Sequence, residues 1–592
     1  MPDSRLIPSS PQEADTYLKW HKFDMPYQNG TQAAVAVPKG VGVVITSLCT
    51  LLLEWIAINS YHVGLACWFA YFLHRHKRAT TPVTSIWNKR WSLTDSILDL
   101  YFMIRKRRWE GVKLYLGVMS LFAVLAFQIA LSVIVPKFLL LDSAAPANPN
   151  RVVILFTESD LSSDRVKEFQ LRVPSALRAA SIARAAPEEL KKKVTITLPE
   201  SLGETENGDQ ILQIKYSYTV SGTDMGLQTA TSLLLSVTGA CTTEYSWLVA
   251  STNSQGIDYN AYQFFNNPNP QYTYNFSAAD SLVPVAFFVL DELTTEKPPR
   301  NVSWALGISS VGRFSYSEGK DPLYRTGPLL KNGSDGAPQY VVLPKRPILS
   351  CWEEDTWTYE GQEGSVSGLN NSDSELPTLF LPEPISDILL VEHMVPRIVT
   401  LGTQLTYSAL QSSVTALGGI IDAESNSFLG DFQQLVLASY ISTANALSES
   451  TLFPPTDDKG LSGGQRNLAV DEKNNPRDGA GKFVVFTSDV VTFRVAALTA
   501  VPVIALLVSA LKTILLARPL KIVNALDAAV LHNTVISSYP KARPTAKSMD
   551  LWLLEGKRCR DEIAQEEGLL EKVRKGGGVR IEIRPVNPLD DS

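Results

Sequence analysis

Three long runs of apolar residues constrain the fold of this chain more than any other feature. They cover residues 41–58, 114–135 and 495–516. Each approaches the roughly 20 residues that an α-helix needs to cross a hydrocarbon core about 30 Å thick. A buried helix of a soluble protein is the alternative, but the second and third runs contain no charged residue except Lys512 near one end. We therefore predict membrane-spanning helices at 114–136 and 495–516.

The first apolar run is harder to interpret because apolar residues continue beyond it to Leu73. A helix of that length is too long for one untilted crossing, and the part after His62 is too short for a second crossing. We predict that residues 39–73 form one transmembrane helix with an interfacial extension. Glu54 and His62 are its intramembrane polar residues. An acid at membrane depth can be functional, although a glutamate near a helix end also fits the membrane interface.

The charges between these runs predict which side of the membrane each segment faces. Residues 74–113 contain ten Lys or Arg and three acidic residues, whereas residues 142–490 contain 24 basic and 41 acidic residues. Positive charge close to membrane ends marks the cytoplasmic side. We predict a multi-pass protein of the plasma membrane or another secretory-pathway membrane. Its N-terminal tail (1–38) and residues 142–490 are exoplasmic, and its loop 74–113 and tail 518–592 are cytoplasmic.

The basic cytoplasmic loop contains an amphipathic pattern. A Ser-x-x-Asp capping pattern begins at Ser92, and apolar residues follow at three- and four-residue spacing up to Ile104. A helix of this kind, lying flat on the bilayer, binds anionic lipid through basic residues such as those at 105–108. Packing against another cytoplasmic segment is the alternative.

Glycosylation sequons and cysteines agree with an exoplasmic location for the large segment. Five Asn-x-Ser/Thr sequons lie in segments predicted to be exoplasmic, although chance alone produces several such triplets; they are at Asn29, Asn275, Asn301, Asn332 and Asn370. Cys241 and Cys351 belong to the same large segment, and an oxidising compartment joins such pairs. We predict a glycoprotein with a Cys241–Cys351 disulfide, with two buried free thiols as the alternative.

Residues 142–453 are predicted to form an α+β domain with a strand-rich first part and a helical last part. Alternating apolar residues separated by turn residues predict strands between about 151 and 380, with a short helix at 174–193. Apolar residues at helical spacing predict helices from about 383 to 448. Gly, Pro, Asp and Asn dominate residues 454–482, which is typical of a mobile loop.

That loop contains Leu-Ser-Gly-Gly-Gln at 461–465, the signature of an ATP-binding-cassette ATPase. Such an ATPase also requires a Walker A loop far upstream of the signature. The one near match, at 476–483, follows the signature, begins with Pro476 and ends with Phe483 in place of a magnesium-binding hydroxyl residue. The segment is also predicted to be exoplasmic, where ATP is scarce. We therefore predict that the chain is not an ABC ATPase.

Residues able to carry out chemistry are scarce in the exoplasmic domain. His393 is its one histidine, so a His-rich zinc site is excluded and a catalytic triad has only one possible base. We predict no metal and no cofactor, and we assign no catalytic residue. The best ligand-binding stretch lies at 350–361, where three acids stand among aromatic residues: Trp352, Glu353, Glu354, Asp355, Trp357 and Tyr359. Carboxylates among aromatics can bind sugars or cations, or hydrolyse glycosides. The alternative is an aromatic strand pair with an acidic turn packed on a disulfide.

This stretch, together with the order of the spans and the basic loop, resembles multi-pass membrane proteins of filamentous fungi that have a large exoplasmic domain. The resemblance implies a fungal setting, where some such proteins accompany secondary-metabolite pathways. It brings no assigned activity and no catalytic residues to transfer.

The function that we predict is non-catalytic binding by an α+β exoplasmic domain anchored by three transmembrane helices. Its expected partners are the lipid bilayer and an exoplasmic protein or glycan, with no nucleic acid. The alternative is an accessory membrane-bound enzyme, a cyclase or transferase, that acts on a lipophilic metabolite. A transporter is disfavoured because three spans make a poor pathway without oligomerisation.

Overall fold

A computed structural model of the chain describes the following residues, with a few isolated positions between 98 and 130: 12–27, 30–76, 138–155, 162–254, 257–266, 271–276, 283–291, 301–329, 340–344, 346–369, 381–453, 467–471 and 473–517. The chain divides into two compact units. Unit 1 comprises Met1–Ile45 and Leu139–Ala497, and unit 2 comprises Thr46–Phe138 and Leu498–Ser592.

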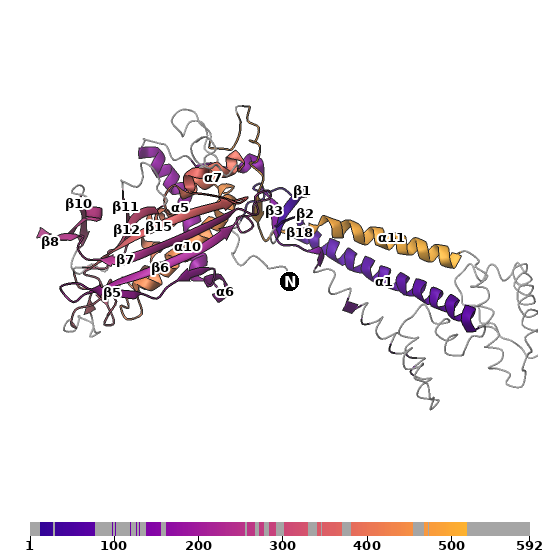
Figure 1. Cartoon of the computed structure of the whole chain (residues 1–592), viewed down its shortest axis with the longest axis horizontal. Helices are drawn as coiled ribbons and strands as arrows, with labels where there is room; N and C mark the ends of the chain where they lie inside the picture. Colours follow the sequence, from indigo (N-terminus) through magenta and orange to yellow (C-terminus); the bar gives the residue numbers. More distant parts are fainter. Residues whose placement is uncertain are drawn as a thin grey trace, which may run out of the picture. The chain divides into compact units, whose positions relative to one another are not determined.

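An antiparallel sheet of eight strands forms the centre of unit 1 (Figure 1). Its main path runs β11-β12-β15-β7-β6-β4, with β16 paired to β15 and β5 paired to β6. The strands are β4 (Val194–Ile196), β5 (Glu200–Glu204), β6 (Gln210–Ser221), β7 (Leu234–Glu244), β11 (Ala286–Leu290), β12 (Asn301–Ile308), β15 (Ile348–Tyr359) and β16 (Gln362–Gly364). The alternating pattern of the sequence explains the sheet, because successive side chains of a strand point to opposite faces. In β6, buried residues from Ile214 to Val220 alternate with exposed or half-buried ones.

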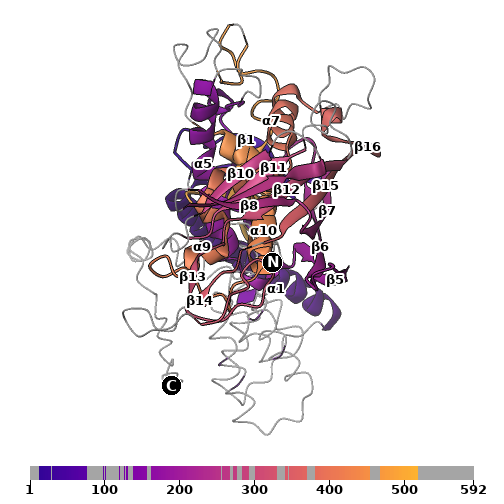
Figure 2. The same cartoon turned by 90° about the vertical axis from the view of Figure 1, so that its left-hand side faces the viewer.

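Helices cover one face of this sheet (Figure 2). They are α5 (Ser162–Arg184), α6 (Glu188–Lys191), α7 (Glu383–His393), α8 (Arg397–Leu405), α9 (Gln411–Thr415) and α10 (Phe428–Ser450). Helix α10 begins at the N-cap Ser427, whose side chain accepts a hydrogen bond from the Gly430 amide. Two ring contacts join α10 to β6: Phe432 packs edge-on against Tyr216, and Tyr440 packs edge-on against Tyr218. The α+β class that the sequence predicted is therefore confirmed.

A smaller sheet covers one end of the opposite face. Its strands are β8 (Leu248–Ser254), β9 (Ile257–Gln263) and β10 (Gln271–Phe276), in the order β10-β9-β8. Trp247, Tyr262 and Phe264 form a second apolar cluster with Ala305 and Ile348 of the large sheet. Apart from the buried Ala240, the neighbouring part of this face contains exposed or half-buried side chains. We call it the open face and define it by Lys215, Thr238, Asn301, Trp352 and Glu354.

Residues near the N-terminus join strands from the far end of the chain. Strand β1 (Lys22–Tyr27) pairs with β2 (Gly30–Pro38), and β2 pairs with β18 (Val490–Arg494). Strand β3 (Ala144–Pro146) similarly pairs with β17 (Val484–Phe486). The segment that the sequence predicts as an N-terminal tail therefore contains two strands. Local patterns could not reveal the pairing of β2 with β18, because these strands lie more than 400 residues apart. The β1–β2 hairpin is local, and the Asn-Gly pair at 29–30 was a sequence signal for it that the prediction of a tail missed.

Two long apolar helices form most of the described part of unit 2. Helix α1 (Lys39–His76) is one uninterrupted helix, and α11 (Val495–Ala517) follows directly after β18. Within them, Lys39–Cys67 and Val495–Ile514 are long and apolar enough to cross a membrane. Two of the three predicted spans are thus present as helices. The predicted span at 114–136 falls outside the described residues except for isolated positions, and it stays a prediction.

Polar side chains join α1 to α11. The Lys512 ammonium donates a hydrogen bond to Asn59 Oδ1 at 2.8 Å, and the Trp55 indole donates one to Ser509 Oγ at 2.8 Å. The Asn59 amide also donates to Ser509 Oγ at 3.3 Å. Trp55 contacts Ser509 and the later residue Asn59 contacts the later residue Lys512, so the two helices run parallel to each other.

Candidate functional site

Strand β15 divides the predicted ligand-binding stretch between the two faces of the sheet. Glu353, Asp355 and Trp357 point inward and are buried, whereas Trp352 and Glu354 point to the open face. Trp352 is 40% exposed and Glu353 is 2% exposed. Tyr359, at the end of the strand, is half-buried. The three acids lie in the middle of a central strand rather than in a turn, so they do not form one acidic cluster.

A glycine on the neighbouring strand allows Tyr216 to reach Glu353. Tyr216, Gly239 and Glu353 lie directly opposite one another on β6, β7 and β15. A side chain at Gly239 would clash with the Tyr216 ring, because its Cβ would lie 2.4 Å from the ring carbon Cζ. The ring instead crosses over Gly239, and its hydroxyl donates a hydrogen bond to Glu353 Oε2 at 2.6 Å. The position of Glu353 is therefore set by two other strands.

The second inward acid meets the single histidine of the domain. His393 is the last residue of α7, and its Nδ1 lies 3.4 Å from Asp355 Oδ2. The imidazole also packs edge-on against the Trp357 ring, with centroids 5.2 Å apart. All three side chains are buried. Strand β15 and helix α7 thus bring Glu353, Asp355 and His393 together, and we call these residues the buried acid cluster.

The buried acid cluster retains unused hydrogen-bonding capacity. Glu353 Oε1, Asp355 Oδ1 and both ring nitrogens of His393 have no hydrogen-bond partner within the described ranges. Buried polar atoms of this kind are normally paired with protein groups or ordered water. Burial raises the pKa of the Glu353 carboxyl well above its usual range, and the Asp355 carboxyl raises it further, while the hydrogen bond from Tyr216 lowers it. The cluster is therefore suited to hold a proton on Glu353.

Replacing Glu353 by Gln is expected to flatten the dependence of thermal stability on pH. The folded state holds the Glu353 proton more tightly than the unfolded chain does, so this contribution is fully present below the usual carboxyl pKa, near 4.5. It is lost as pH rises through the higher pKa of the folded state. Melting temperatures between about pH 5 and pH 8 should therefore fall less in Glu353→Gln than in the wild type.

Glu354→Gln, which changes the next residue on the opposite face, is the matched control and should keep the wild-type pH profile. Equal pH profiles for the wild type and Glu353→Gln would contradict a shared proton in the buried acid cluster.

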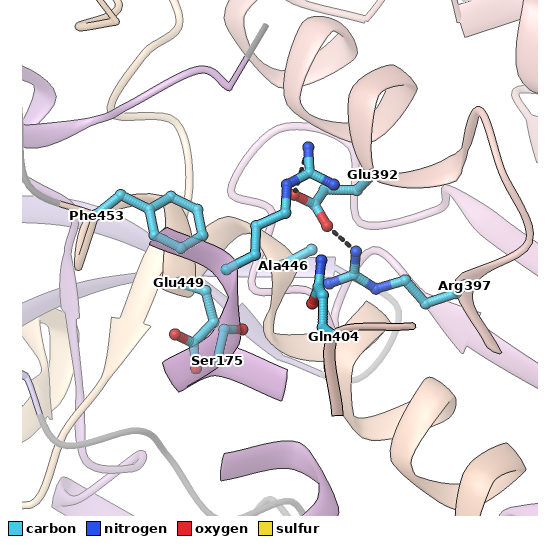
Figure 3. A pocket seen from close by; sticks show the side chains of 8 residues that line it. Ser175, Glu392, Arg397, Gln404, Ala446, Glu449 and Phe453 are labelled. Atoms are coloured by element: carbon cyan, nitrogen blue, oxygen red, sulfur yellow. Dashed lines mark hydrogen bonds and ion pairs between the residues drawn. The ribbon is translucent and has the colours of Figure 1, made fainter. Parts of the chain in front are cut away.

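A second group of buried charges lies between α5, α7, α8 and α10. Arg397 of α8 donates a hydrogen bond to Glu392 of α7 and two to Ser442 Oγ of α10, at 3.1 and 2.6 Å. Arg172 of α5 forms an ion pair with Glu392 at 3.8 Å. Figure 3 shows Glu392 and Arg397 facing each other in a small pocket that Glu449 of α10 also lines. We call Arg172, Glu392 and Arg397 the buried ion-pair cluster.

Opposite charges balance one another around this pocket. Glu449 accepts a hydrogen bond from Arg178 Nε of α5 at 3.1 Å, so each acid lining the pocket faces at least one arginine. Burial, and to a smaller extent the nearby Arg172, lower the pKa of Arg397 to about 9. The guanidinium therefore remains charged at neutral pH. This arrangement links four helices, and the two arginines that line the pocket are matched by its two glutamates.

The polar residues predicted within the first span occupy different environments. Glu54 is exposed on α1, whereas His62 is buried. The polar contacts between the helices use Trp55, Asn59, Ser509 and Lys512 instead. Asn59 was not predicted as an interhelical residue. An amide side chain within a long apolar run was the sequence signal of this role.

Among the remaining predicted features, the structure contains the Cys241–Cys351 disulfide between directly opposite residues of β7 and β15. Asn301 is exposed at the start of β12, and Asn275 lies in β10. The sequons at Asn29, Asn332 and Asn370 lie outside the described residues, as do the signature-like residues 461–465.

The described part of the loop 454–482 packs within unit 1 through the buried Ala469 and Ala480.

The described part of the chain contains no group of three or more His, Cys, Asp or Glu side chains that could hold a metal ion.

The fold and the site define a class of protein: an α+β domain with buried charges on one face of its sheet and an open second face, continuous with apolar helices. The chain belongs to the family described as "Domain of unknown function (DUF8406)", which matches residues 173–485, just over half of the 592 residues. No curated protein and no solved structure matches the chain. The family match covers the large sheet and its helices, and it excludes α1 and α11.

Proposed function

We propose that this protein is a membrane-anchored, non-catalytic binding protein whose open sheet face recognises an exoplasmic glycan or protein. The proposal depends on how β15 distributes the side chains of residues 350–361 between the two faces of the sheet. Glu353 and Asp355, the acids that could serve catalysis, point to the buried face, whereas Trp352 and Glu354 point to the open face. An exposed indole surrounded by polar side chains is suited to contact a ligand through both apolar area and hydrogen bonds.

Chain connectivity supports three spans and an exoplasmic unit 1. Residues 12–38 and 139–494 belong to one unit, and one compact unit lies on one side of a membrane. If α1 crosses the membrane, the chain must cross back before Leu139 to rejoin that unit. The apolar run at 114–135 supplies this second crossing. Helices α1 and α11 run parallel to each other, as this topology requires, and the basic segments that follow them then face the cytoplasm.

The same topology places the basic loop 74–113 against the cytoplasmic leaflet. Its predicted amphipathic helix would bind anionic lipid there, in a plasma membrane or another secretory-pathway membrane.

Ligand profiling of the full chain in detergent micelles tests the binding function. Glycans and candidate exoplasmic proteins that raise the melting temperature of the wild type are expected to bind Trp352→Ala about two- to tenfold more weakly, since an aromatic contact contributes about 0.5–1.5 kcal/mol. Tyr407→Ala is the matched control, because Tyr407 is an exposed aromatic residue of the helical part, 54% exposed. A ligand that binds wild type and Trp352→Ala equally well would contradict the proposal for this face.

Catalysis by the buried acid cluster is the second candidate function. A carboxyl group with a raised pKa beside a histidine is a pattern found at active sites, which favours this alternative. An accessory enzyme acting on a lipophilic metabolite would then depend on Glu353. Loss of such an activity in Glu353→Gln, with activity retained in Glu354→Gln, would favour the enzyme over the binding protein.

A further inference from the structure

A glycosylation sequon lies beside Trp352 on the open face. Asn301, the first residue of β12, is directly opposite Glu354 of β15, and Ser303 is directly opposite Trp352. Directly opposite residues of an antiparallel pair point to the same face. The Asn301 side chain is exposed. Both polar residues of this sequon, Asn301 and Ser303, therefore share the open face with the indole.

The register places a glycan on Asn301 within reach of the indole. Diagonal neighbours across an antiparallel pair have Cβ atoms roughly 7–8 Å apart, and Asn301 and Trp352 are such a pair. A sugar joined to the asparagine amide lies several ångströms beyond the Cβ atom. The first sugar can therefore cover the ring of Trp352 without any change in the backbone.

Small residues on both neighbouring strands leave the indole accessible. Trp352 is opposite Ser303 on β12 and opposite Ala240 on β7, so no bulky side chain flanks it from either strand. Beyond Ala240, the exposed Lys215 stands on β6 in the same row. Lys215, two strands from Trp352, and Glu354, two residues further along β15, place a cationic and an anionic side chain on the same face as the ring. An apolar ring with such neighbours matches a sugar, which has an apolar C–H surface and a rim of hydroxyl groups.

We propose that Asn301 carries an N-linked glycan whose first sugar packs on Trp352 and controls access to the open face. This inference rests on the exoplasmic orientation of the proposed function and adds a regulator of the same site. In the attachment step, the Asn301 amide nitrogen forms a bond to the anomeric carbon of a lipid-pyrophosphate-linked oligosaccharide. The bond from that carbon to the phosphate oxygen breaks, the lipid pyrophosphate leaves, and the amide nitrogen loses one proton.

A double-mutant cycle on the full chain tests the contact. The chain is expressed in a eukaryotic host, and glycan occupancy at each sequon is measured by peptide mass spectrometry. Asn301→Gln and Trp352→Ala are each expected to lower the melting temperature by about 1–3 °C, because either change removes the same sugar–indole contact. The double variant should melt no lower than the single variants. Additive losses would overturn the contact.

Three further variants make the test specific. Ser303→Thr keeps the sequon and should keep the wild-type melting temperature, while Trp352→Phe keeps an aromatic ring and should restore part of the stability. Asn275→Gln removes a sequon of the small sheet, so its effect should add to that of Trp352→Ala. Trimming the glycan to its first sugar should preserve the coupling with Trp352, since that sugar makes the contact.

The chemical accessibility of Trp352 tests whether the glycan controls access to the open face. Modification of Trp352 by N-bromosuccinimide, followed by peptide mapping, should be several-fold faster in Asn301→Gln than in the wild type. Equal rates would overturn shielding by the glycan. An unmodified Asn301 in a chain glycosylated at other sequons would overturn this inference alone. A chain without a glycan at any sequon would instead overturn the exoplasmic orientation, and with it both proposals.

Discussion

Replacing Glu392 by Gln is expected to lower the free energy of unfolding by about 3–5 kcal/mol. The change leaves the guanidinium groups of Arg397 and Arg172 buried without the carboxylate that they share. An uncompensated charge in a protein interior is among the most destabilising changes, because its desolvation is no longer offset. Chemical denaturation of the full chain, followed by tryptophan fluorescence, measures the difference.

Asp387→Asn provides a control within the same helix. Asp387 pairs with Arg477 at 3.4 Å, but these side chains are 40% and 42% exposed. Solvent screens such a pair, so its loss should change the free energy of unfolding by about 1 kcal/mol or less. If Glu392→Gln and Asp387→Asn had equal effects, the buried ion-pair cluster would not have the role that we assign to it. Replacing Glu392, Arg397 and Arg172 together by apolar residues should recover much of the loss, because no buried charge of the cluster then lacks a partner.

Removing the disulfide with Cys241→Ala and Cys351→Ala is expected to lower the free energy of unfolding by about 2–5 kcal/mol. The cross-link joins residues separated by 110 positions. It therefore restricts the unfolded chain strongly in the chain-entropy account of disulfide stability. Both residues are buried in the centre of the large sheet. Thermal melts of the double variant and of the wild type, with and without a reducing agent, measure the effect.

Cys67→Ala is the control for this experiment, because Cys67 is a free, exposed cysteine of α1. It should melt at the wild-type temperature, and a reducing agent should lower its stability as much as that of the wild type. If a reducing agent left the wild-type melting temperature unchanged, the disulfide would not contribute to stability under those conditions.

Local patterns were sufficient to predict several parts of this protein. Long apolar runs predicted α1 and α11, since an apolar stretch of about 20 residues is long enough to cross a membrane as a helix. Alternation predicted the strand that begins at Gln210, and a shift to helical spacing predicted the helices from Glu383 onward. The cysteine pair was predicted because only two cysteines belong to the large segment.

The roles of the acids within β15 depended on the tertiary structure. Successive residues of any strand point to opposite faces, so Trp352 and Glu353 are on different faces. Aromatic residues occur on both faces of β15, and Trp357 is on the inner one. Hydrophobicity therefore does not identify the buried face. The buried face is the one that helix α10 covers, where it packs on Tyr216 and Tyr218. Because Gly239 has no side chain, the Tyr216 ring can cross it and reach Glu353.

What the sequence by itself determined was the set of elements that form from nearest neighbours: the apolar helices, the alternating strands and the amphipathic helices. What only the tertiary structure decided was which distant elements meet. The pairing of β2 with β18, the contact of Asp355 with His393 and the shared face of Asn301 and Trp352 all join residues far apart in the chain or on different strands. Their energies arise from long-range contacts, for which a local sequence pattern contains no signal.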